Sequence, residues 1–79
     1  MMKILLIDDH KLIKIGIKVL LEDNEEFSVI DDCSSKKEFL EKIDNETYDL
    51  FICDISLPDG SGYDILEIVK ERKIKTKII

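Results

Sequence analysis

The chain has 79 residues, of which 18 are Asp or Glu and 12 are Lys or Arg, so its formal net charge is −6 at pH 7. This length allows one domain, residues 1–79, and a chain this short buries only about 60–65% of the surface that it exposes when unfolded. A nucleic-acid surface normally needs clustered basic residues, so the acidic balance argues against direct contact with nucleic acid.

The amino terminus carries no pattern of a signal peptide or a membrane span. Met1, Met2 and Lys3 precede only four apolar residues, whereas both kinds of segment need a longer apolar run. The two cysteines, Cys33 and Cys53, lie twenty residues apart, a spacing that matches no metal-binding motif. We therefore expect a cytoplasmic protein without a membrane partner, with both cysteines as reduced, packed thiols.

The first predicted strand, residues 4–7, is apolar and ends in Asp8 and Asp9. A helix is predicted over residues 11–22, because its apolar residues recur at helical spacing and form a wide stripe that we expect to be buried: Ile13, Ile17, Leu20 and Leu21. Gly16 costs this helix up to about 1 kcal/mol relative to Ala, so it either allows close packing on the sheet or is tolerated. His10, the only histidine, is predicted to be exposed in the first turn.

A short second strand is predicted over residues 27–30. Ser35 and Glu38 have the spacing of a capping box at a helix start, and the helix that follows directs Phe39, Leu40 and Ile43 inward before it ends near Asn45. Residues 50–53 are four apolar residues bounded by turn formers, which is typical of a strand buried on both faces of a parallel sheet. Asp54 stands at its carboxyl end.

After Asp54, the sequence Pro58-Asp59-Gly60 predicts a turn, and residues 61–64 resemble another capped helix start. This third helix places Ile65, Leu66 and Val69 on one face, and residues 76–79 begin a fourth strand. Strands that alternate with helices across short loops predict an α/β fold, an open parallel sheet with flanking helices and right-handed connections.

Three carboxylates follow the first and third predicted strands. If these strands are parallel neighbours, Asp8, Asp9 and Asp54 meet at the carboxyl edge of the sheet, where ligands bind in such folds. Carboxylates this close to one another repel with an energy on the order of several kcal/mol. A Mg²⁺ ion, which takes carboxylates and water as ligands, offsets this repulsion. The alternative is that these residues are ordinary acids that cap helices or solvate turns.

The combination of motifs resembles the receiver domain of two-component response regulators. The resemblance runs from about residue 3 to residue 79 and rests on the acidic pair after the first strand, on Asp54 with Pro58 four residues later, and on Gly62 eight residues after Asp54. It implies a flavodoxin-like topology with the strand order 2-1-3-4-5. The residue matching Asp54 accepts a phosphoryl group from a sensor histidine kinase in this family. The resemblance also implies a Mg²⁺ cofactor held by Asp8, Asp9, Asp54 and the backbone carbonyl of Ser56.

A complete receiver has five strands and five helices, whereas this sequence stops inside the fourth strand, so the domain is an incomplete β-α-β-α-β-α-β. The family's hydroxyl residue and lysine, which contact the phosphoryl group, have no counterpart in it. An uncovered sheet face and an edge strand also favour self-association as a homodimer.

The predicted function is a phosphoacceptor signalling domain rather than an enzyme, with self-catalysed transfer onto Asp54. A phosphorylation-impaired dimerisation module is the alternative. A phosphatase of the haloacid dehalogenase kind ranks last, because it needs a second acid where Ser56 stands.

Overall fold

The computed structural model describes residues 2–79, and for residues 27–29 the backbone only. The elements in chain order are β1 (Met2–Ile7), α1 (Lys11–Glu22), β2 (Phe27–Cys33), α2 (Lys36–Asn45), β3 (Leu50–Cys53), β4 (Ser56–Leu57), β5 (Gly60–Ser61), α3 (Gly62–Glu71) and β6 (Lys77–Ile78). None of the helices described is long and apolar enough to cross a membrane.

The main sheet has four parallel strands in the order β2-β1-β3-β6, which confirms the predicted α/β fold and the first four places of the implied strand order. Ile7 at the end of β1 pairs with Cys33 on one side and with Cys53 on the other. The ends of β1 and β3 are therefore neighbours. A small antiparallel pair, β4 and β5, follows Asp54, where the sequence predicts only a loop and a turn.

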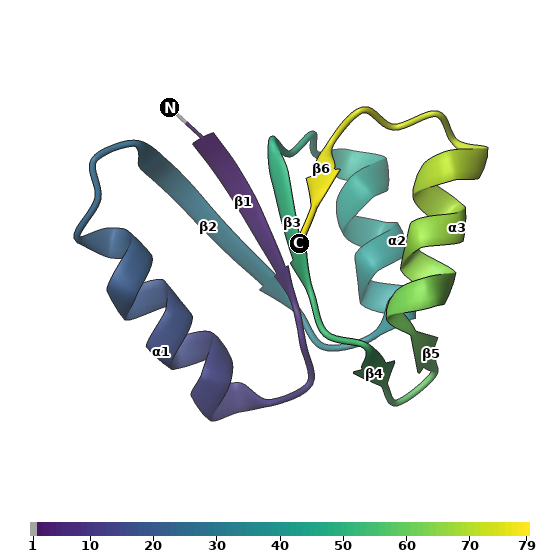
Figure 1. The fold of residues 1–79 in the computed structure, drawn as a ribbon, viewed down its shortest axis with the longest axis horizontal. Coiled ribbons are helices and arrows are strands. Elements are labelled where there is room, and N and C mark those ends of the chain that lie inside the picture. Colours follow the sequence, from purple (N-terminus) through teal and green to yellow (C-terminus); the bar gives the residue numbers. More distant parts are fainter. Residues whose placement is uncertain (1) are drawn as a thin grey trace.

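The core lies between the sheet and helices α2 and α3, which share one face of the sheet (Figure 1). Leu5 and Ile7 of β1 belong to this core together with Phe51 of β3, Phe39 of α2 and Ile65 of α3. The rings of Phe39 and Phe51 meet edge to face, with centroids 5.2 Å apart. Each such buried side chain contributes about 1.5–3 kcal/mol of hydrophobic free energy.

Helix α1 covers the opposite face of the sheet and is the only described helix on that side (Figure 1). The prediction that its apolar stripe is buried is wrong for two residues, since Ile13 is 49% exposed and Leu20 is 74% exposed. The residue that α1 buries most is Lys14, whose amine donates a hydrogen bond to the Ser34 hydroxyl at 2.7 Å. No described element packs over the outer part of the stripe, so it faces solvent.

Two serines begin the helices of the core face, as predicted. Ser61 forms a complete capping box with Asp64 at α3. Of the capping box predicted for Ser35 and Glu38, the structure shows one half, in which the Ser35 hydroxyl accepts a hydrogen bond from the Glu38 amide at 3.1 Å. The first-turn amides of α2 are satisfied by a more distant residue, because the Asp59 carboxylate accepts hydrogen bonds from the backbone N–H groups of residues 36 and 37 at 2.7 and 3.0 Å. These two bonds tie the loop after β3 to α2.

Candidate metal and phosphoacceptor site

The three predicted carboxylates meet at the carboxyl edge of the sheet. The backbone continues β1 and β3 to this point, because Asp8 donates its N–H to the Cys33 carbonyl at 3.1 Å and Asp54 donates its N–H to the Ile7 carbonyl at 2.8 Å. Asp8, Asp9, Asp54 and His10 each place one potential ligand atom within 4.8 Å of the others. The side chains of Asp8, Asp9 and Asp54 are 15%, 39% and 29% exposed, respectively.

The donor set fits a divalent cation. An ion with oxygen ligands at about 2.1 Å has adjacent ligands about 3.0 Å apart and opposite ligands about 4.2 Å apart in octahedral geometry, and a cluster of four atoms within 4.8 Å of one another matches that size. Carboxylate oxygens are the ligands that Mg²⁺ prefers. The Mg²⁺ site itself stays a prediction.

The Asp54 carboxylate has two oxygens in different surroundings. Oδ1 accepts a hydrogen bond from the backbone N–H of Ile55 at 2.8 Å, which fixes the orientation of the side chain. Oδ2 lies toward the cluster, 3.4 Å from His10 Nδ1. One oxygen is therefore held by the loop, and the other is directed at the shared site.

Ser56, whose backbone carbonyl is the fourth predicted ligand, lies in β4, two residues beyond Asp54, where it pairs with Ser61. The Ser56 residue is exposed to solvent. The role of its carbonyl stays a prediction.

Sequence reasoning gave His10 an exposed position and no part in the site. The side chain is 57% exposed as expected, but its Nδ1 lies 2.7 Å from Asp8 Oδ1 and 3.1 Å from Asp9 Oδ1. The hydrogen bond to Asp8, together with the charges of Asp9, Asp8 and Asp54, raises the pKa of His10 above its usual value. The sequence signal that could have identified it is its position directly after the acidic pair.

Gly62 is the second residue whose contribution the sequence did not explain. A Cβ at this position would lie 2.8 Å from the backbone oxygen of Asp54 and 3.2 Å from the Cα of Ile55. Only a residue without a side chain allows α3 to begin this close to the backbone of Asp54 and Ile55. Gly16, in contrast, has nothing within 4 Å of a Cβ built on it, so of the two readings of this residue the structure favours simple tolerance.

The thiol of Cys53 adjoins the site but is not activated. Burial raises its pKa to about 11, with smaller contributions from the charges of Asp54 and Asp8. Burial likewise raises the pKa of Cys33 to about 12. Both cysteines are free, as predicted, and neither has the lowered pKa of a nucleophilic thiol.

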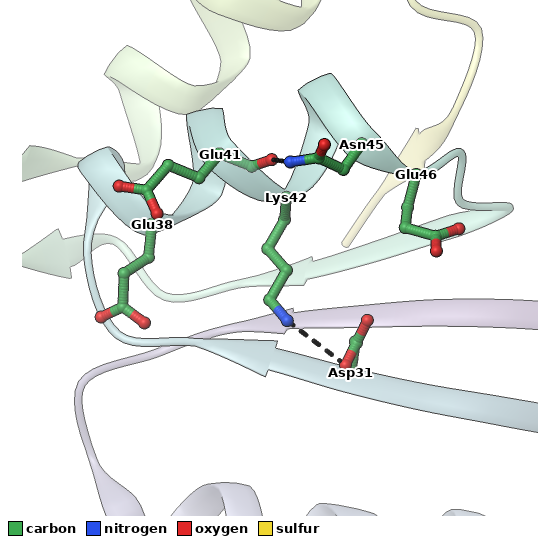
Figure 2. A pocket seen from close by; sticks show the side chains of 6 residues that line it. All are labelled: Asp31, Glu38, Glu41, Lys42, Asn45 and Glu46. Carbon is green, nitrogen blue, oxygen red and sulfur yellow. Dashed lines mark hydrogen bonds and ion pairs between the residues drawn. The ribbon is translucent and has the colours of Figure 1, made fainter.

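A separate groove of about 330 Å³ lies between α2 and β2, away from the carboxylate cluster. Figure 2 shows Lys42 reaching from α2 toward Asp31 of β2, and its amine lies 3.5 Å from the Asp31 carboxylate. The other lining residues are Glu38, Glu41, Asn45 and Glu46. The residues that line this groove are mostly acidic and include no pair of a nucleophile and a base. We assign the groove no function.

The model of the response regulator receiver domain family matches residues 4–79. Among curated proteins, the chain is 41% identical to the sensory transduction protein LytR of Staphylococcus haemolyticus over 78 residues, which are 99% of this chain and 30% of LytR. The chain thus spans about a third of the length of such relatives.

Solved structures agree on the fold. The response regulator TrrA of Thermotoga maritima, solved in complex with Mg²⁺ and a beryllium fluoride, superposes with a TM-score of 0.88 at 32% identity, over 99% of this chain and 66% of its own. The MaeR response regulator bound to beryllium trifluoride superposes with a TM-score of 0.94 at 24% identity, over 100% of this chain and 65% of its own.

The prediction that the protein makes no direct contact with nucleic acid is not supported. RcsB from Salmonella enterica serovar Typhimurium was solved bound to a promoter, and it superposes with a TM-score of 0.88 at 22% identity over 98% of this chain and 45% of its own. Proteins that share this fold thus include one that binds DNA, and the net charge of 79 residues does not exclude nucleic acid as a partner of a longer protein. The sequence motifs, the sheet order and these matches agree, and the chain belongs to the response regulator receiver domain family.

Proposed function

We propose that this receiver domain accepts a phosphoryl group on Asp54 from a phosphohistidine of a sensor histidine kinase, with Mg²⁺ as its cofactor. The observation that carries the proposal is the cluster of Asp8, Asp9 and Asp54 at the ends of two adjacent parallel strands, in a chain of this family. Asp9, Asp54 and the Ser56 carbonyl would hold the ion, and Asp8 would orient it mainly through water.

The transfer exchanges one bond for another. A carboxylate oxygen of Asp54 attacks phosphorus, the phosphorus–nitrogen bond of the phosphohistidine breaks, and the departing imidazole keeps the bonding electron pair. The bond from the Ile55 N–H to Oδ1 holds the carboxylate of Asp54 in one orientation. When bound, the cation neutralises charge on the transferring oxygens, and such reactions depend chiefly on positioning and electrostatics.

The chain contributes to the transfer by positioning the reacting groups, and the product is its own phosphorylated form, as in a signalling domain. A small phosphodonor would then supply the phosphoryl group in place of the kinase. The dimerisation module, which the sequence left as the alternative, is not favoured as the main function, because the acidic site is complete in its three carboxylates. The cytoplasmic location stays a prediction.

Incubation with Mg²⁺ and acetyl phosphate, followed by intact-mass measurement, tests the proposal. We expect one added phosphate in the wild type and none in Asp54→Asn. Asp23→Asn, a change at the exposed end of α1, is the matched control and should keep the adduct. Hydroxylamine should remove the phosphate, because acyl phosphates react with it and phosphoserine does not. A persistent adduct in Asp54→Asn, or none in the wild type even with a kinase, contradicts the proposal.

We also propose that these 79 residues self-associate as a homodimer through the uncovered sheet face or the edge strand β6, and that the exposed apolar side of α1 belongs to the same interface. Leu12, Val19 and Leu20 are 84%, 57% and 74% exposed there, and apolar patches of this kind recruit partners. Light scattering at high micromolar concentration should give a dimer, which Leu12→Lys combined with Leu20→Lys returns to a monomer. Tyr63→Lys on α3, also at an exposed position, should leave the dimer intact. A wild-type monomer at that concentration contradicts this part.

A further inference from the structure

The charge of the molecule opposes the approach of a phosphodonor. The chain has a formal net charge of −6 and gathers three carboxylates at the site, whereas phosphodonors are anions, which such a surface repels. A cleft lined by the opposite charge raises the local concentration of a charged substrate and speeds its arrival. A cationic surface beside the carboxylates would therefore favour the transfer.

A groove of about 420 Å³ between α1 and the carboxyl end of β2 has this character. Asp9 borders it, so the groove adjoins the carboxylate cluster. Three lysines of α1 line it, together with Ile15, Asp32 and Ser34: Lys11, Lys14 and Lys18. The groove in Figure 2, in contrast, is lined by four acids and one lysine.

Lys14 is built into the floor of this groove. It is the one charged residue that the described part of the chain buries, and its side chain is 10% exposed. Its amine donates a hydrogen bond to the Ser34 hydroxyl at 2.7 Å, whereas the Asp32 carboxylate lies 3.7 Å away, beyond hydrogen-bond reach. An ammonium group has three N–H donors, so two of them have no acceptor among the described residues.

The positive charge of the groove is only partly balanced. Lys18 forms an ion pair with Asp32, and the hydrogen bond from Lys18 lowers the pKa of Asp32. Lys11 is exposed at the start of α1, whose first turn carries no acid, and no ion pair among the described residues includes it. Asp9 belongs to the carboxylate cluster. Lys11 and Lys14 are therefore available to an anion.

We infer that this groove binds the phosphate group of a small anionic phosphodonor on its way to Asp54, through the amines of Lys11 and Lys14. The inference rests on the proposed phosphoacceptor function and adds a binding site for the donor. Ammonium groups form strong charge-assisted hydrogen bonds with phosphate oxygens, so free inorganic phosphate binds there as well. Both lysines are positioning residues, because they raise the occupancy of the donor and take no part in the exchange of bonds.

Binding is tested with inorganic phosphate and the Asp54→Asn protein, which separates binding from transfer. In a titration without divalent metal at constant ionic strength, the ¹⁵N amide signals of Asp32 and Ser34 should shift and saturate. Adding Lys11→Gln should weaken the binding about two- to fivefold, the value of an exposed ion pair. Adding Lys14→Gln should weaken it at least about tenfold, since a hydrogen bond to a charged group is lost, and circular dichroism checks that this variant folds.

Lys42→Gln is the matched control, because it removes a lysine that is paired with the neighbouring acid of β2, Asp31, and lies in the other groove. It should leave the phosphate affinity unchanged. Shifts at Asp32 and Ser34 that do not saturate, or the same phosphate affinity in all three lysine variants, would overturn the inference.

Transfer from acetyl phosphate at saturating Mg²⁺ gives the second measurement. In a chain that keeps Asp54, Lys11→Gln should slow adduct formation about two- to fivefold at low donor concentration, and excess donor should restore the wild-type rate, because the lost binding is uniform. High salt should remove the difference, and Lys42→Gln should match the wild type. An adduct that forms equally fast in Lys11→Gln and the wild type refutes this inference alone, whereas no adduct in the wild type, even with a kinase, refutes the proposed function and this inference with it.

Discussion

Replacing Gly62 by Ala tests how tightly the segment after Asp54 is packed. The new Cβ would lie 2.8 Å from the Asp54 carbonyl oxygen and 3.2 Å from the Ile55 Cα, whereas carbon contacts are most favourable at about 3.5–4.0 Å. Both neighbours are backbone atoms, so the loop must move by roughly half an ångström. Such overpacking costs about 1–3 kcal/mol, and the better helix propensity of Ala returns up to about 1 kcal/mol.

We therefore expect Gly62→Ala to lower the free energy of unfolding by about 1–2 kcal/mol. In a domain of this size that corresponds to a fall in Tm of roughly 4–16 °C. Gly62 does not have a positive φ, so the loss comes from the contact and not from the backbone conformation. The Ile55 N–H also holds Asp54 Oδ1, so the same shift should disturb the carboxylate and weaken the binding of divalent ions.

Gly16→Ala is the matched control, because the same methyl group is added inside α1 where nothing lies within 4 Å. Only helix propensity then acts, and we expect a gain of about 0.5–1 kcal/mol. Thermal and urea unfolding followed by circular dichroism measure both variants. If Gly62→Ala is as stable as the wild type while Gly16→Ala is stabilised as expected, the argument from close approach is refuted.

Three further changes test local features of the fold. Lys73 follows α3 with φ 55°, a left-handed conformation that a side chain disfavours, so Lys73→Gly should raise the free energy of unfolding by about 1 kcal/mol in urea titration; a loss of stability would contradict this. The amides at the start of α2 hold the pKa of Asp59 below its usual value, so its contribution is present above about pH 4, the value for an unfolded Asp, and is lost as the pH falls through the lower folded pKa. Asp59→Asn should therefore be less stable than the wild type at neutral pH, with a difference that shrinks in acid; a constant difference would exclude this linkage. Because burial raises the pKa of Cys33 to about 12 and that of Cys53 to about 11, iodoacetamide at about pH 8 should alkylate both far more slowly than a free thiol with its pKa near about 8.5, and rapid labelling of the native protein would disprove it.

The sequence predicted the sheet because local patterns and the global fold agree there. The apolar runs ending in Asp9 and Asp54 have the composition of buried parallel strands, and the alternation with helices leaves few arrangements of the chain. From these two patterns we predicted that the carboxylates lie at the carboxyl edge of the sheet, and in the structure they lie close together there. Helical periodicity likewise identified α1 over residues 11–22 with its observed bounds.

Periodicity did not predict what α1 packs against. It identifies residues that share a face, and Ile13 and Leu20 do share one, but burial requires a second surface, and among the described elements none covers them. Long-range partners were missed for a similar reason. The hydrogen bonds from α2 to Asp59 span 22 and 23 residues, and no local pattern marks a carboxylate that caps a helix so far away in the chain.

The segment from Asp54 to Gly62 explains why the site is precise although it lies on a loop. Its first residue is held to β1 by the bond from Asp54 N–H to the Ile7 carbonyl, and its last is held back to its own start by the bond from Gly62 N–H to the Ile55 carbonyl at 2.7 Å. Asp59 fastens the middle of the segment to α2. The segment is thus fixed at three points, two of which lie at the first turns of α2 and α3. These bonds link the segment that carries Asp54 to the first turns of both core helices.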